Sequence, residues 1–205
     1  MKLKICGMKY PENIIEVSSL LPDYMGFIFW GKSTRCVEGF IPLLPKSIQK
    51  VGVFVDATIA EIQSKIKQYD LDAIQLHGNE DVDFCENLKS ENIEIIKVFS
   101  IHNTFNFNQL AAFEKHCDYF LFDTKGKLPG GNGMTFDWDI LKNYPSKTPF
   151  FLSGGIGMDE LDRIKNLNLP LYAIDVNSKF EIEPGLKNTI LLKTFQKKIQ
   201  NELSR

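Results

Sequence analysis

Short apolar segments recur along this chain at regular intervals. They are rich in β-branched and aromatic residues, which favour β-strands. Successive segments begin roughly 21–31 residues apart, which is the length of one strand and one helix joined by short loops. The predicted strands are Leu3–Cys6, Tyr24–Trp30, Val51–Val55, Ala73–Leu76, Ile95–Phe99, Tyr119–Asp123, Phe150–Ser153 and Leu171–Val176.

Between the predicted strands, apolar residues recur at steps of three and four, as on one face of a helix. The predicted second helix, near Gly39–Lys46, has the weakest pattern, because Pro42 and Pro45 interrupt it. The clearest faces are Ile59, Ile62, Ile66 and Tyr69, then Met158, Leu161, Ile164 and Leu167, and finally Leu192, Phe195, Ile199 and Leu203.

Strands that are apolar on both faces need cover on both faces, and their alternation with helices makes them parallel. We therefore predict a (β/α)₈ TIM barrel formed by one domain, residues 1–205. An open, doubly wound sheet of eight strands is the alternative. We favour the barrel because the chain has neither a G-x-G-x-x-G motif after its first strand nor a P-loop, and an open nucleotide-binding sheet often carries one.

Composition and charge exclude several classes of function. Hydrophobic residues make up 43% of the chain, and 24 basic residues against 26 acidic ones give a formal net charge of −2. This balance argues against nucleic acid as a main partner, and no apolar run reaches the ~18 residues of a membrane helix. The N-terminal apolar stretch is too short for a signal peptide, so we expect a cytoplasmic protein.

The cysteines and histidines predict no metal site. The four cysteines never occur at C-x-x-C spacing, and the three histidines form no cluster with them. Free thiols in a reducing compartment are the expected state.

Two loops predict a phosphate site. In a barrel of this type the active site lies at the C-terminal ends of the strands, and phosphate often binds after strands seven and eight. Gly154-Gly155 follows the seventh predicted strand and Asn177-Ser178 follows the eighth. Glycines allow backbone N–H groups to approach an anion closely. A tight turn without a ligand is the alternative.

A third glycine-rich segment follows the sixth strand. It contains Gly130, Gly131 and Gly133 in a loop of about twelve residues, which is long for a compact domain. We interpret it as a mobile flap over the ligand; an unconstrained surface loop is the alternative.

Cys6 and Asp123 are candidates for acid–base catalysis. They end the first and sixth strands, which lie about three steps apart on a ring of eight and so face each other across its mouth. A thiolate and a carboxylic acid placed in this way can remove one proton and deliver another. Taken alone, Cys6 is more typical of a small buried core residue, and Asp123 is equally typical of a helix cap or an ion-pair partner. The sequence leaves open whether Lys4, close to Cys6, points inward.

Three further residues are candidates for substrate binding. Arg35 lies in the loop after the second predicted strand, at a distance around the ring from the predicted phosphate loops. Its guanidinium can bind a substrate carboxylate through two hydrogen bonds; a surface ion pair is the alternative. His77 follows the fourth strand and either lines the mouth or bonds to backbone. Asp175 ends the eighth strand.

The motifs together resemble the phosphoribosylanthranilate isomerase family. The resemblance runs in order from residue 3 to about residue 188 and rests on the combination of motifs. These are Lys4-Ile5-Cys6-Gly7, Gly26-Phe27-Ile28-Phe29, Ser33-Thr34-Arg35, Gly52-Val53-Phe54-Val55, Gln75-Leu76-His77-Gly78, Gly130-Gly131-Asn132-Gly133, Phe136-Asp137-Trp138, Leu152-Ser153-Gly154-Gly155-Ile156, Asp175-Val176-Asn177-Ser178 and Pro184-Gly185-Leu186-Lys187.

The resemblance implies an isomerase of tryptophan biosynthesis that acts on N-(5'-phosphoribosyl)anthranilate by an Amadori rearrangement, without a cofactor. It implies that Cys6 is the general base, Asp123 the general acid and Arg35 the neighbour of the anthranilate carboxylate. It also implies that the Gly154-Gly155 and Asn177-Ser178 loops hold the phosphate. The chain departs from the family pattern where Thr34 replaces proline, Asn177 replaces serine, and Lys179-Phe180 replaces Gly-Val.

Two other functions compete with this one. A carbon–carbon lyase or aldolase would need a Schiff-base lysine or paired carboxylates at the mouth, and the only candidate lysine, Lys97, lies inside the fifth strand. A non-enzymatic phosphosugar-binding protein would have no use for both Cys6 and Asp123. We expect a monomer, because no exposed apolar helix face is evident in the sequence.

Overall fold

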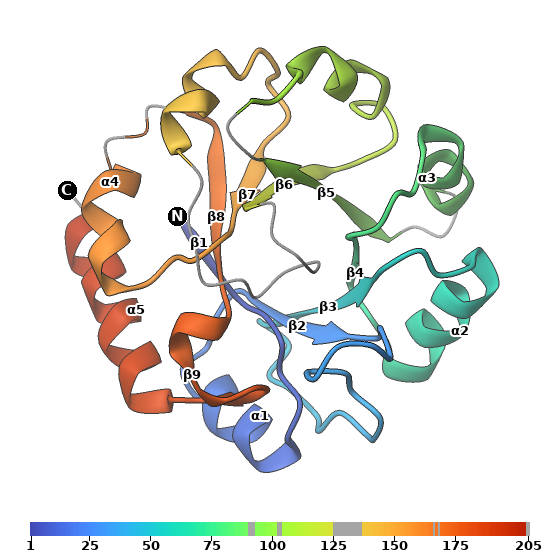
Figure 1. Cartoon of the computed structure of the whole chain (residues 1–205). Helices are drawn as coiled ribbons and strands as arrows, with labels where there is room; N and C mark the ends of the chain where they lie inside the picture. Colours follow the sequence, from blue (N-terminus) through green and yellow to red (C-terminus); the bar gives the residue numbers. More distant parts are fainter. Residues whose placement is uncertain (90–92, 102–103, 125–136, 166, 168, 204–205) are drawn as a thin grey trace.

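The predicted strands close into a barrel. In the computed structural model, eight parallel strands pair in chain order, and β1 pairs with both β2 and β8 (Figure 1). The structure describes residues 1–203 except 90–92, 102–103, 125–136, 166 and 168. The (β/α)₈ prediction is confirmed, and the closure between β1 and β8 excludes the open sheet. The strands are β1 Lys2–Ile5, β2 Tyr24–Ile28, β3 Gln49–Phe54, β4 Ala73–Leu76, β5 Glu94–Ile101, β6 Tyr119–Thr124, β7 Phe150–Leu152 and β8 Leu171–Val176.

Helices surround the ring of strands (Figure 1). They begin where the sequence supplies a suitable first turn: Pro11 starts α1, and Thr58 caps α2 by accepting a hydrogen bond from the Glu61 backbone N–H. The α-helices are α1 Pro11–Ser18, α2 Ile59–Tyr69, α3 Val82–Lys89, α4 Leu161–Lys165 and α5 Thr189–Leu203. The 3₁₀ helices are η1 Phe107–Ala112, η2 Trp138–Asn143, η3 Met158–Glu160 and η4 Ser178–Phe180, and a small hairpin, β9 Glu181–Glu183 and β10 Leu186–Lys187, precedes α5.

The predicted second helix is wrong. Residues 37–45 contain no helix, and the chain passes from β2 to β3 through turns and irregular structure. Pro42 and Pro45 explain this outcome, because each lacks a backbone N–H and clashes with the preceding helical turn.

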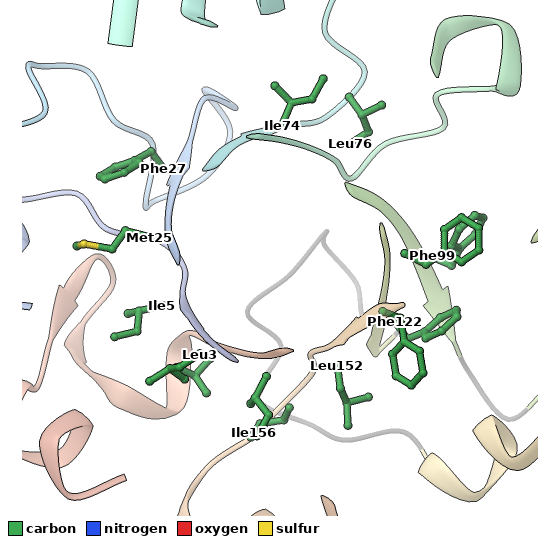
Figure 2. Close-up of a cluster of buried hydrophobic side chains, with 14 of the residues drawn as sticks. Leu3, Ile5, Met25, Phe27, Ile74, Leu76, Phe99, Phe122, Leu152 and Ile156 are labelled. Atoms are coloured by element: carbon green, nitrogen blue, oxygen red, sulfur yellow. The ribbon is translucent and has the colours of Figure 1, made fainter. Parts of the chain in front are cut away.

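Each strand sends alternate side chains outward and inward. Outward-pointing side chains fill the layer between the strands and the helices, and Figure 2 shows Leu3 and Ile5 of β1 and Phe122 of β6 on this side. A second, smaller cluster fills the lower interior of the barrel: Tyr24, Val51, Ala73, Ile96, Val98, Leu121, Phe151 and Ala173. The closed end and the packed outer layer leave the C-terminal mouth as the place for a site.

This alternation decides which polar side chains enter the mouth. Because Leu3 and Ile5 point outward, Lys4 and Cys6 point inward, and Asp123 points inward beside the outward Phe122. The sequence left the direction of Lys4 open, and the structure answers it. Among the described helices, none is long and apolar enough to cross a bilayer.

Candidate active site

A cavity opens at the C-terminal mouth of the barrel. Both polar and apolar side chains bound it, as is common for ligand sites. Its walls come from the ends of the strands and the loops that follow them. The lining residues are Cys6, Ile28, Trp30, Ser33, Arg35, Val53, Val55, Gln75, His77, Asp123, Ser153, Gly154, Gly155, Ile156, Asp175, Asn177, Ser178 and Lys179.

Cys6 and Asp123 both line this cavity, as predicted. Cys6 extends the β1 ladder, because its backbone N–H donates to the Val176 carbonyl at 2.9 Å. Asp123 lies inside β6, and its Oδ1 accepts a 2.8 Å hydrogen bond from the Thr124 backbone N–H. The thiol residue is 5% exposed and the carboxylate residue 4%, so both reach the cavity from fixed, buried positions.

His77 lies beside the Asp123 carboxylate. Its Nε2 is 3.4 Å from Asp123 Oδ2, and its Nδ1 is 3.4 Å from Gln75 Nε2. Of the two sequence readings, lining the mouth is therefore the one that the structure shows. The imidazole restricts where the carboxylate can turn, and Gln75, which the sequence analysis did not single out, restricts the imidazole.

Lys4 and Asp175 form a buried ion pair under the cavity. Their Nζ and Oδ2 atoms are 2.9 Å apart, with side-chain exposures of 0% and 5%. The other oxygen of Asp175, Oδ1, is buried and has no hydrogen-bond partner among the described residues. It is a free acceptor in a residue that lines the cavity, suited to a ligand hydroxyl group.

These charges act on Cys6. Burial raises the pKa of the Cys6 thiol above its ordinary value; the ammonium groups of Lys4 and Lys187 oppose the rise, and the Asp175 carboxylate adds to it. Burial also raises the pKa of Asp175, against the effect of Lys4. In the free protein Cys6 is therefore mainly a thiol at neutral pH, with two cations in place to stabilise a thiolate.

The two loops predicted to bind phosphate are adjacent at the cavity wall. Gly154 and Gly155 have φ angles of +90° and +65°, a left-handed conformation that turns successive N–H groups toward one side. Asn177, Ser178 and Lys179 line the cavity next to them. The helix after Gly155 is short, since η3 begins at Met158 and α4 at Leu161, so backbone N–H groups rather than a long helix dipole provide the positive potential.

Gly154 admits no other residue without strain. A Cβ at this position would collide with the Thr124 side chain and lie 2.8 Å from the Thr124 backbone nitrogen. We expect Gly154→Ala to lower the free energy of unfolding by about 1–3 kcal/mol, because it adds a left-handed alanine to this clash. Urea denaturation measures the change. Gly31→Ala is the control, because a Cβ at Gly31 would meet no atom within 4 Å, and it should change stability by less than about 0.5 kcal/mol.

Arg35 lies closer to the phosphate loops than the sequence analysis expected. Its guanidinium forms a two-pronged ion pair with Glu181, with Nε–Oε1 at 2.9 Å and Nη2–Oε2 at 2.7 Å. In the closed ring β2 is only two strands from β8, so the loop after β2 meets the segment after β8. Arg35 lines the cavity, and its side chain is 16% exposed.

Glu181 and Lys187 are functional candidates that sequence reasoning missed. Lys187 lies in the Pro184–Lys187 motif, but a lysine in a short hairpin reads as a surface residue. In the structure Lys187 is 1% exposed, and its Nζ is 2.7 Å from Glu181 Oε1. No local pattern signals this burial, because it depends on the hairpin folding back against α1, where the backbone of Lys187 bonds to the Asn13 side chain.

The lysine required by the aldolase alternative points elsewhere. Lys97 lies on the outward face of β5, where its Nζ donates to Glu80 Oε2 at 2.8 Å and to the Gly78 carbonyl at 2.9 Å. It does not line the cavity. Among the described residues no group of three or more His, Cys, Asp or Glu side chains could hold a metal ion. The predicted flap residues Gly130, Gly131 and Gly133 lie outside the described residues.

Comparison with known proteins identifies the family. The family model of N-(5'phosphoribosyl)anthranilate (PRA) isomerase matches residues 3–198. The chain belongs to this family. The N-(5'-phosphoribosyl)anthranilate isomerase of Parabacteroides distasonis is 44% identical over 209 residues, covering 97% of this chain and 93% of the relative.

Solved structures of the isomerase family share this barrel. Phosphoribosyl anthranilate isomerase from Thermotoga maritima superposes with a TM-score of 0.84 at 28% identity, covering 100% of both chains. A second structure, of phosphoribosyl anthranilate isomerase in complex with reduced 1-(o-carboxyphenylamino)-1-deoxyribulose 5-phosphate, has a TM-score of 0.77 at 26% identity and covers 100% of both chains. The family resemblance inferred from the motifs is therefore confirmed.

Proposed function

We propose that this member of the isomerase family converts N-(5'-phosphoribosyl)anthranilate to 1-(2-carboxyphenylamino)-1-deoxyribulose 5-phosphate, a step of tryptophan biosynthesis. Cys6 is the general base and Asp123 the general acid. One observation carries this assignment: a thiol from β1 and a carboxyl group from β6 enter the same cavity, next to a wall of glycine N–H groups. The rearrangement delivers a proton to the ring oxygen and removes one from a sugar carbon, so it needs one positioned acid and one positioned base.

The reaction balances with these two side chains. Asp123 protonates the ring oxygen of the ribose as its bond to C1 breaks, and the nitrogen lone pair forms a C=N bond, giving a protonated Schiff base. Cys6 then removes the proton from C2, and the electron pair of that C–H bond neutralises the Schiff base to an enolamine. Protonation at C1 and loss of the hydroxyl proton at C2 give the ketone, with no external oxidant or reductant.

The ends of the substrate have separate partners in this proposal. The N–H groups of Gly154 and Gly155, together with Asn177 and Ser178, bind the phosphate. Arg35 binds the anthranilate carboxylate, exchanging part of its contact with Glu181 for the ligand. Asp175, through its unpaired Oδ1, accepts a hydrogen bond from a sugar hydroxyl.

The rate should depend on pH through Cys6. Burial raises the pKa of this thiol, so the thiolate fraction grows as pH rises through and beyond the ordinary thiol value of about 8.5. In the unchanged chain, loss of the Asp123 proton acts in the opposite direction, because the acid must be protonated while the base is not. The residual kcat/KM of Asp123→Asn, which has no acid to titrate, should therefore rise with pH across the neutral and alkaline range; a flat profile for this variant would argue that Cys6 is not the base.

A direct assay tests the proposed function. Freshly prepared phosphoribosylanthranilate is a fluorescent substrate for a continuous assay, and the purified chain should accelerate its conversion in proportion to protein concentration. No acceleration above the spontaneous rate, with folded protein, would reject the proposal.

We also propose that the chain works as a monomer in the cytoplasm. All four cysteines are free, as a reducing compartment would keep them. The exposed large apolar side chains of the described residues, such as Ile15, Leu43 and Ile190, come from different segments rather than one helix face. A Thermotoga maritima relative, 26% identical, is described as dimeric. Sedimentation equilibrium distinguishes the two states.

A further inference from the structure

Lys187 is a buried cation to which the proposed mechanism gives no contact with the substrate. It belongs to β10, and its side chain is fully buried. Its Nζ donates to Asn177 Oδ1 at 2.6 Å and to Glu181 Oε1 at 2.7 Å. Burying an ammonium group costs free energy. A buried ammonium group is therefore expected to be paired with acceptors, to serve the site, or both.

The contact with Asn177 fixes the orientation of an amide. An ammonium group only donates hydrogen bonds, so the amide atom facing Lys187 is the oxygen. The amide NH₂ group then faces away from Lys187, and Asn177 lines the cavity next to the predicted phosphate loops. Among the described residues, the structure shows no acceptor for a hydrogen bond from this NH₂ group.

Gly7 leaves room for the amide to lie in this position. A Cβ on Gly7 would be 2.6 Å from Asn177 Oδ1 and 3.1 Å from Asn177 Nδ2. The amide plane therefore lies directly over the backbone that follows Cys6, between the end of β1 and the end of β8. Packing and the hydrogen bond from Lys187 together hold it there.

Lys187 itself is held by Glu181. The Glu181 carboxylate also pairs with Arg35 and accepts a 3.0 Å hydrogen bond from the Gly185 N–H. Although burial opposes it, Arg35 and Lys187 hold the pKa of Glu181 below its ordinary value, so the carboxylate stays charged. The cation that orients Asn177 is therefore anchored independently of any ligand.

We propose that Lys187 is a positioning residue: it orients the Asn177 amide so that the NH₂ group donates to the phosphate of the substrate. The inference rests on the proposed function for the identity of that phosphate. A hydroxyl rotates freely to donate, whereas an amide must be turned the right way round, so an asparagine at position 177 needs a donor that fixes its oxygen, and Lys187 is that donor.

A double-mutant cycle tests this role by calorimetric titration with the reduced product analogue, 1-(o-carboxyphenylamino)-1-deoxyribulose 5-phosphate. Asn177→Ala and Lys187→Met should each weaken binding about tenfold, the value of one hydrogen bond to a charged group. In the Asn177→Ala background, Lys187→Met should add less than about twofold, because its partner is gone. Lys142→Met, at an exposed lysine, is the matched control and should bind like the unchanged chain.

A second variant keeps the test decisive if Lys187→Met does not fold. Asn177→Asp retains the contact with Lys187 but replaces the NH₂ group with a carboxylate oxygen that faces the phosphate. It should bind the analogue more weakly than Asn177→Ala. Binding by Asn177→Asp as tight as that of the unchanged chain, or full additivity of about a hundredfold in the cycle, would overturn the proposal.

Inorganic phosphate separates this inference from the proposed function. It is titrated as a second probe, since it reports on the phosphate loops without any turnover. Loss of phosphate affinity in Asn177→Ala and Lys187→Met supports the positioning role even in a chain that fails to isomerise phosphoribosylanthranilate. Unchanged phosphate affinity in both folded variants contradicts it, whatever the turnover.

Discussion

Cys6→Ala should lower kcat about a thousandfold, the typical contribution of a positioned general base. The methyl group cannot remove the C2 proton, while the walls that hold the phosphate and carboxylate are unchanged. Affinity for the reduced product analogue should therefore stay within about tenfold. Steady-state kinetics and calorimetric titration of the folded variant measure the two quantities.

Cys36→Ala is the matched control for this change. Cys36 is another free, partly exposed thiol, but it does not line the cavity. Its removal should leave kcat and KM unchanged. Near-normal turnover by Cys6→Ala would remove the thiol from the mechanism and leave the base unassigned.

Asp123→Asn should lower kcat to a similar extent, about a thousandfold. Asparagine has the same shape and keeps the contact with the Thr124 N–H, but it cannot protonate the ring oxygen. The ring then opens only at the slow uncatalysed rate. The fluorescence assay and titration with the product analogue, applied to the folded variant, test this.

Asp139→Asn provides the control, because Asp139 is an exposed carboxylate paired only at the surface with Lys142. It should leave activity and stability within error of the unchanged chain. An Asp123→Asn variant that turns over at more than about a tenth of the original rate would contradict the role of Asp123 as the acid. Because the two catalytic groups serve one reaction, the double variant should be little worse than either single one.

The sequence was informative wherever local periodicity sets the structure. Strand alternation on Leu3, Ile5 and Phe122 is visible in the hydrophobic pattern, and it carries Cys6 and Asp123 to the interior once the barrel closes. The helix predicted around Pro42 and Pro45 is wrong, because these two residues oppose a helix more strongly than the alternation of strands and helices favours one.

Long-range ion pairing was beyond the sequence. The pairs Lys4–Asp175 and Arg35–Glu181 join residues 171 and 146 positions apart. Neither spacing nor composition selects such partners, because they form only when ring closure brings β8 against β1. The distance of Arg35 from the phosphate loops was misjudged for the same reason: position along the chain is a poor measure of position on a closed ring.

The burial of charge at the mouth follows from these pairings. Lys4 and Lys187 are both fully buried, and each is compensated by a carboxylate. Both ammonium groups lower the cost of a negative charge on the Cys6 sulfur. Burial keeps Cys6 mainly protonated in the free protein, and the two cations reduce the cost of forming its thiolate.

The most direct measurement of the central claim is a crystal structure of this chain with the reduced product analogue. The account predicts the analogue in the cavity, its phosphate on the Gly154 and Asn177 loops, with the Cys6 sulfur and an Asp123 oxygen each about 3–4 Å from the sugar atoms between which protons move. A ligand bound elsewhere, or a sugar that either side chain fails to reach, would contradict it.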